Sequence, residues 1–201
     1  ILWGAAFANL VQGMRIEVID TASGAPVPAS EVPTDVLIHG ASHQITGGFL
    51  SLLTPFTLLG GAVTCLLFLT HGALYIALKT AGPLSERALR LAKRSSIASA
   101  AVTAVWALWA QLAHSSNALA WIPLVIAALA LIGSLGLARQ DRIGWAFALH
   151  FVGIAFAVVF IFAAMAPDVM RSSIDAAYSL TIQQAASADT TLLIMTVAAV
   201  V

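Results

Sequence analysis

The sequence predicts an all-α membrane protein, a polytopic bundle of transmembrane helices. Of its 201 residues, 60% are hydrophobic and 9% are charged, whereas soluble domains have about 25% charged residues. The mean hydropathy is +0.96. Three runs contain no Asp, Glu, Lys or Arg, and each exceeds the roughly 20 apolar residues that cross a bilayer: 36–78, 95–138 and 143–167. These features exclude a water-soluble globule.

Charge and cysteine content exclude several other classes. The formal net charge of zero argues against a basic surface for nucleic acid or a polybasic membrane anchor. The single cysteine, Cys65, has no disulfide partner and lies in an apolar run, so we expect a small buried residue. The chain starts without Met and stops in an apolar stretch, and we expect further residues on both sides.

We expect four complete spans and two truncated ones. Two polar segments, 13–53 and 167–189, separate the truncated spans from the complete ones. The first segment contains an extended piece at 16–19 and ends in an apolar lead-in along the membrane interface. A polar break at 114–117 divides the longest uncharged run. The complete spans are expected at 54–79, 91–113, 120–138 and 144–166, with 1–12 ending one span and 190–201 beginning another.

Local signals mark several helix ends. Gly13 would stop the first helix. Thr54 can cap the next, with Pro55 at the first helical position, where its missing N–H does no harm. Gly and Pro within 81–83 would end that span. The last span would be capped by Ser187 or Asp189.

The charges predict the orientation. By the positive-inside rule, the side with most basic residues is cytoplasmic, which assigns loops 80–94 and 139–142 to the cytoplasm and loops 13–53 and 167–189 to the exterior. Seven of the nine basic residues lie on the first side: Lys79, Arg87, Arg90, Lys93, Arg94, Arg139 and Arg142.

Few residues within the spans suggest chemistry, since none carries a carboxylate or an ammonium at mid-membrane depth. His71 and His150 lie inside spans. Either one could bind haem or a metal, or be a neutral residue hydrogen-bonded in the bundle. His39 and His43 are spaced four residues apart, but a metal site is disfavoured because they lie in a Pro- and Gly-rich loop.

Other polar and aromatic residues favour structural roles. Asn9 and Gln12 can satisfy the last carbonyls of a helix or bond to a neighbouring helix. The tryptophans suit interface anchoring and core packing, with quinone stacking as the alternative: Trp3, Trp106, Trp109, Trp121 and Trp145. Glycines within the spans suggest close helix contacts: Gly60, Gly61, Gly133, Gly136 and Gly153.

Several strings, taken in order, carry a family resemblance. They are FANLVQG (7–13), GGFLSLLTPFTLLGG (47–61), LTHGALYIALKTAGPL (69–84), PDVMRSS (167–173), AYSLTIQQAAS (177–187) and LLIMT (192–196). Together they resemble subunit II of cytochrome bd quinol oxidase. The similarity covers nearly the whole chain and is weakest across 85–145.

This resemblance implies a multi-pass subunit in a bacterial inner membrane, paired with a haem-bearing subunit I. The complex would oxidise quinol and reduce dioxygen to water. The haem b and haem d groups would lie in subunit I, so no catalytic or metal-binding residue is assigned to this chain. A quinone or lipid could bind here, and small accessory subunits could join the complex.

At the residue level the resemblance implies positioning roles. The residues that match the family's strings are Asn9, Gln12, Gly13, Pro55, His71, Ser172, Ser173 and Thr181. The family varies between His and Gln at the position of His71, which argues against obligate ligation.

Two functions of other classes stay open. A multi-pass transporter would have a substrate site among Asn9, Gln12, His71 and His150, although the lack of charge within the spans disfavours it. A membrane scaffold without a redox role is the other.

Overall fold

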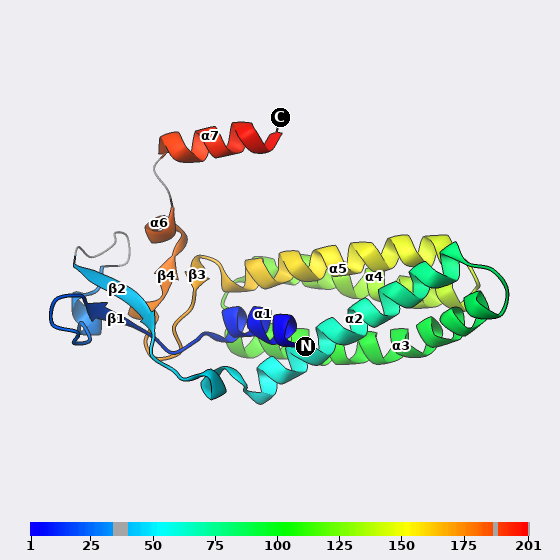
Figure 1. Ribbon diagram of the computed structural model, residues 1–201, viewed down its shortest axis with the longest axis horizontal. Coiled ribbons are helices and arrows are strands. Elements are labelled where there is room, and N and C mark those ends of the chain that lie inside the picture. The colour runs from blue at the N-terminus through cyan, green and yellow to red at the C-terminus, as the bar shows by residue number, and fades with distance from the viewer. Residues whose placement is uncertain (34–39, 187–188, 201) are drawn as a thin grey trace.

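The computed structural model describes residues 1–33, 40–186 and 189–200, and it is an all-α, multi-pass membrane protein (Figure 1). Four of its helical segments are long and apolar enough to cross a membrane. They are α2 (Pro55–Lys79), α3 (Gly82–Trp109) with its π-helical continuation η3 (Ala110–His114), α4 (Trp121–Arg139, preceded by the 3₁₀ turn η4, Ala118–Ala120) and α5 (Ile143–Met165).

These helices form one elongated bundle. Helices α2 and α3 form one closely packed pair, and α4 and α5 form the other. The short helix α1 (Leu2–Gln12) packs against α2 and also contacts α5. The main apolar core lies where all five helices meet, around Phe56, Trp106, Leu131 and Phe160.

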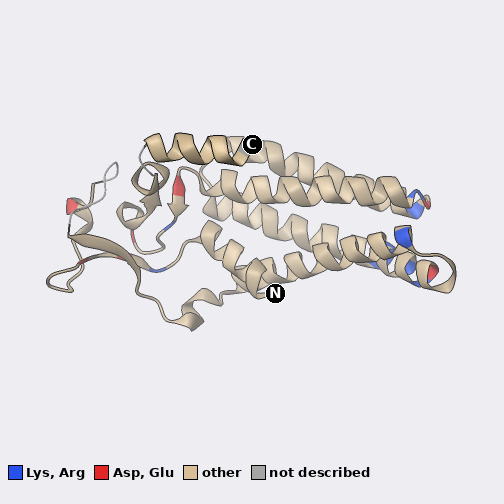
Figure 2. Ribbon diagram, turned by 45° about the horizontal axis from the view of Figure 1, so that its top comes forward, with Lys and Arg blue, Asp and Glu red and all other residues tan. Residues whose placement is uncertain are grey.

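The two ends of the bundle differ in charge and structure. Most Lys and Arg residues lie at one end, where α2 meets α3 and α4 meets α5 (Figure 2). We call it the basic end. The polar segments and their small sheets lie at the opposite end, which we call the sheet end (Figure 1).

The start of α2 confirms the predicted cap. Thr54 Oγ1 accepts a hydrogen bond from the Thr57 amide at 3.2 Å, and the Thr54 amide donates to Thr57 Oγ1 at 2.9 Å. Pro55 occupies the first helical position. This reciprocal capping box satisfies amides that have no partner within the helix.

The predicted loop 80–94 was wrong. Helix α3 begins at Gly82 rather than at residue 91, so only residues 80 and 81 separate it from α2. The sequence signal was misread because Pro83 lies in the first turn of α3, where proline is tolerated, instead of stopping α2. Four basic residues assigned to this loop therefore lie in the first half of α3: Arg87, Arg90, Lys93 and Arg94.

The sheet end contains strands that the sequence analysis largely missed. Strand β1 (Ile16–Asp20) includes the predicted extended piece and pairs antiparallel with β2 (Ala41–Ile45). Strand β3 (Asp168–Met170) pairs antiparallel with β4 (Leu180–Thr181).

Short helices complete the described chain. The apolar lead-in to α2 is a 3₁₀ helix, η2 (Phe49–Leu52). The others are η1 (Ala29–Glu31), η5 (Ala176–Tyr178), α6 (Ile182–Ala185) and the apolar α7 (Asp189–Val200). Two predictions, the cap at Ser187 and the role of His39, fall outside the described residues.

Cys65 is exposed, not buried as expected. An uncharged run predicts that a residue lies at membrane depth, but it does not predict whether the residue faces the helices or the lipid. The same limit applies to the glycines. A side chain at Gly133 would strike Leu149, as expected of a close helix contact, whereas one at Gly136 would meet nothing within 4 Å.

The crossing of α1 and α2 depends on Gly60. A Cβ atom at this position would lie 2.6 Å from the Cβ of Ala8, closer than carbon atoms pack. Gly60→Ala should therefore lower the free energy of unfolding by about 1–3 kcal/mol, the usual cost of overpacking. Gly72→Ala is the matched control on the same helix, because nothing lies within 4 Å of its Cβ. Thermal unfolding in detergent compares the two, and equal stability would contradict this packing.

Candidate functional site

Most of the residues singled out in the sequence come together at the sheet end. Asn9, buried in α1, donates from Nδ2 to the carbonyls of Ala5 at 2.8 Å and Leu52 at 2.9 Å. Gln12 Oε1 accepts a hydrogen bond from Thr54 Oγ1 at 2.7 Å. Both amides thus connect the end of α1 to the segment that leads into α2.

Gly13 lets the two polar segments approach each other. Its φ of 94° lies in the left-handed region, and the backbone of Arg171–Ser173 lies 3.3 Å from where its side chain would begin. Beyond it, the Met14 amide donates to the Arg171 carbonyl at 2.9 Å, and the Ser173 amide donates to the Met14 carbonyl at 2.8 Å. Residues far apart in sequence are thereby joined through their backbones.

Ser172 and Thr181 stabilise the second polar segment. The buried Ser172 hydroxyl donates to the Ile16 carbonyl at 2.8 Å, and the Ser172 amide donates to Ser179 Oγ at 3.0 Å. Thr181 caps α6 by accepting from the Gln184 amide at 3.3 Å. In this structure these residues hold the backbone in place.

Arg171 lies at the centre of this cluster, and the sequence analysis did not single it out. Its guanidinium pairs with Asp168 at 3.2 Å, and the Arg171 side chain is 17% exposed. It also donates to four backbone carbonyls, those of Val11, His114, Ala164 and Met165. These carbonyls end α1, η3 and α5, where the last carbonyls of a helix have no partner within it and the helix dipole favours a cation.

The sequence did contain a signal for Arg171. Only Arg15 and Arg171 among the nine basic residues belong to the acidic polar segments, against the charge bias. A basic residue in segments where acidic residues predominate indicates a local interaction partner, and the carbonyls at the helix ends are that partner. Beside Arg171 lies a polar pocket of about 530 Å³, lined by Asp168, Asp175 and five serines: Ser115, Ser116, Ser172, Ser173 and Ser179.

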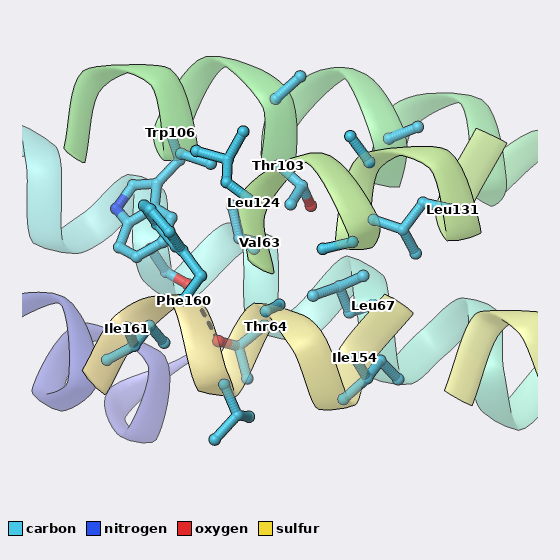
Figure 3. A pocket seen from close by; sticks show the side chains of 18 of the residues that line it. Val63, Thr64, Leu67, Thr103, Trp106, Leu124, Leu131, Ile154, Phe160 and Ile161 are labelled. Carbon is cyan, nitrogen blue, oxygen red and sulfur yellow. Dashed lines mark hydrogen bonds between the residues drawn. The ribbon is translucent and has the colours of Figure 1, made fainter. Parts of the chain in front are cut away.

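A second, apolar cavity of about 280 Å³ lies within the bundle (Figure 3). All five bundle helices contribute to its wall, among them α1 through Gly4 and α4 through Leu131. Its polar lining side chains are Thr64, Thr103 and Trp106. The cavity suits a mainly apolar molecule.

His71 and His150 lie together near the basic end, a juxtaposition that the sequence analysis missed. Their ring centroids are 5.5 Å apart with 25° between the planes, and the His71 ring also stacks on Phe147 at 4.4 Å. Because the stacked imidazoles turn their faces toward each other, they do not fit a haem iron held between their nitrogens. The two histidines lie at a similar distance from the basic ends of α2 and α5, and this similarity could have predicted from the sequence that they meet.

The residues proposed for a transporter site do not converge. Asn9 and Gln12 are bonded to the lead-in and cap of α2 at the sheet end, whereas His71 and His150 stack in the other half of the bundle. Within the described residues there is also no group of three or more His, Cys, Asp or Glu side chains that could hold a metal ion.

Comparisons with known proteins agree on one family. The family model described as "Cytochrome bd terminal oxidase subunit II" matches residues 1–201. Cytochrome bd ubiquinol oxidase subunit 2 of Bacillus subtilis (strain 168) is 30% identical over 98% of this chain and 56% of its own length. Cytochrome bd-I ubiquinol oxidase subunit 2 of Escherichia coli (strain K12) is also 30% identical over the same shares. The chain thus spans little more than half the length of these relatives.

The Arg171 contacts predict a large loss of stability when the guanidinium is removed. Arg171→Met should lower the free energy of unfolding by about 2–4 kcal/mol, since hydrogen bonds to a charged group are lost and buried carbonyls are left without partners. Arg171→Lys should recover only part of it, because an ammonium cannot reach three helix ends at once. Arg15→Lys, an exposed basic residue of the same end, is the control in denaturant unfolding. An Arg171→Met variant as stable as the control would contradict the assignment.

His43 predicts a pH dependence at the sheet end. It lies on β2 opposite Val18, and burial lowers the pKa of its imidazole, so the folded state favours the neutral form. Its contribution to stability is therefore complete above the unfolded pKa of about 6.5 and is lost as the pH falls through the lower folded value. Proteolysis of the β1–β2 sheet should accelerate on acidification, and His43→Gln should flatten this dependence. A wild-type rate that is independent of pH would contradict it.

Proposed function

The chain belongs to the cytochrome bd terminal oxidase subunit II family, and we propose that it forms part of the subunit II of a membrane-bound quinol oxidase. The match along residues 1–201 is the observation that carries the proposal. In the complete protein this subunit would support a haem-bearing subunit I, which oxidises quinol and reduces dioxygen to water. Haem b and haem d would be bound by subunit I.

We propose that the subunit lies in the bacterial inner membrane with its basic end in the cytoplasm. The seven basic residues near the helix connections at that end support this orientation. The sheet end, with Asp168 and Asp175, would face the exterior. The exposed apolar side chains along all the spans would meet lipid and the partner subunit.

The contribution of this chain would be positioning rather than redox chemistry. Asn9, Gln12 and Arg171 satisfy polar groups where helices end near the membrane boundary, which fixes the relative height and tilt of the helices. A bundle held in this way offers a constant surface to subunit I. The apolar cavity, with its few polar groups, would take a prenyl or acyl chain from the bilayer, and a quinone is the proposed ligand of this kind.

The two alternatives receive less support. A transporter needs a shared substrate site, and the four residues considered for one lie in two separate places. A scaffold without any role in an oxidase does not account for the family match over the whole chain.

Copurification tests the proposed function. The complete protein, tagged and extracted from native membranes in mild detergent, should bring down one larger chain with the reduced-minus-oxidised absorption bands of haem b and haem d. Membranes that lack only this subunit should lose those bands, since the partner loses its support. A haem-free, monodisperse preparation without a partner would contradict the proposal, and uptake assays in proteoliposomes would then test transport.

A further inference from the structure

Unpartnered polar groups concentrate on one helix. Among the described residues, nine buried side-chain nitrogen and oxygen atoms have no hydrogen-bond partner, and five of them belong to the span Gly82–His114. Buried polar atoms are normally hydrogen-bonded, so such a concentration needs an explanation. The five atoms are Ser99 Oγ, Thr103 Oγ1, Trp106 Nε1, Gln111 Oε1 and His114 Nε2.

The two hydroxyls differ from others in the same bundle. Thr64 and Ser96 each donate to the carbonyl four residues earlier, at 3.1 and 2.5 Å, which is the usual solution for a hydroxyl within a helix. Ser99 and Thr103 make no such bond, although they are only 1% and 8% exposed. Their hydroxyls are free to bond to something outside the helix.

These groups follow one another along the buried face of the span. Ser95, Ser99, Thr103 and Trp106 are three or four residues apart, which places them on one side of α3, and all four are buried. The row ends in the bundle interior where Thr70 of α2 donates to Ser95 Oγ at 2.9 Å. Gln111, also buried, continues the row into η3. Its longer spacing from Trp106 fits the π-helical turn, which has more residues than an α-helical one.

The row reaches the surface at the sheet end. His114 lines the polar pocket of about 530 Å³ together with Arg171. Its ring contacts Phe56 at 4.6 Å, and Phe56 stacks on Trp106 at 5.3 Å, so one aromatic cluster joins the two polar groups. From Ser99 to His114 the row is about 22 Å long at 1.5 Å per residue.

We propose that this buried face binds a file of water molecules that enters from the polar pocket and ends at the Thr70–Ser95 pair. The mixture of groups suits water, which both donates and accepts: the Trp106 indole only donates, Gln111 Oε1 only accepts, and the hydroxyls do both. Buried water typically makes about three hydrogen bonds to such groups. The apolar cavity borders the file at Thr103 and Trp106, and its other walls have few groups that could form hydrogen bonds with water.

The file would be a polar route from the sheet end to the middle of the bundle, closed toward the basic end. It goes beyond the proposed oxidase role and does not depend on haem. Its chemistry is the exchange of water, and of protons along it, with the aqueous phase at the sheet end.

Radiolytic hydroxyl labelling tests the file in the complete protein, in its native complex within lipid nanodiscs. Radicals formed from bound water modify the side chains beside it. Trp106, 5% exposed, should be labelled several-fold faster than Phe160, 2% exposed, after correction for the intrinsic reactivity of each ring. Labelling of Trp106 no faster than that of Phe160 would overturn the proposal.

Matched variants distinguish labelling by bound water from labelling caused by a general opening of the bundle. Ser99→Ala and Thr103→Val remove hydroxyls that we assign to the file, so each should lower Trp106 labelling several-fold. Ser96→Ala removes a buried hydroxyl of the same helix that is already bonded to the Ala92 carbonyl, and it should leave Trp106 labelling unchanged. Equal labelling in all three variants and the wild type would overturn the proposal, and the wild-type comparison stands even if one variant fails to fold.

Discussion

The arrangement of the bundle depends on how three helices end at the same boundary. The last carbonyls of any helix lack partners within it, and near the hydrocarbon region water cannot satisfy all of them. Here a single guanidinium, that of Arg171, donates to the ends of α1, η3 and α5 and is itself held by Asp168. The planar, five-donor geometry of arginine suits this role better than any other side chain. The small sheets and the turn at Gly13 make these contacts possible, because they place Arg171 between the ends of the helices.

The two halves of the bundle differ in how far their polar groups are hydrogen-bonded. At the sheet end, many backbone groups that would lack partners are bonded to the side chains of Asn9, Arg171 and Ser172, and His114 Nε2 is buried without a partner among the described residues. Deeper in the bundle, unpartnered groups prevail: Ser99, Thr103 and both nitrogens of His150 are buried without partners among the described residues. A region that leaves polar atoms unsatisfied is where a ligand or water adds stability. The proposed water file runs from the sheet end into this region and borders the apolar cavity at Thr103 and Trp106.

Much of the fold could be predicted from the sequence, because uncharged runs and the Thr54–Pro55 signal report local physics. The presence of four spans and the start of α2 follow from these signals, whereas the start of α3 at Gly82 was predicted wrongly. What failed depends on tertiary structure: which face of α2 carries Cys65, that His71 and His150 meet, and that β2 pairs with β1. Asn9 and Gln12 were identified as amides at a helix end, and Ser172 through the family resemblance. Arg171 was missed because four of its partners are backbone carbonyls, so that only its position against the charge bias marked it in the sequence.

The central claim is that Arg171 holds the helix ends together, and amide hydrogen exchange in the complete complex tests it most directly. In Arg171→Met, exchange should accelerate in the last turns of α1 and α5 and in residues 13–16, because the contacts that join them are lost. Exchange near the Thr70–Ser95 pair should stay as slow as in the wild type. Unchanged exchange at the sheet end, or an equal increase throughout the bundle, would contradict the claim.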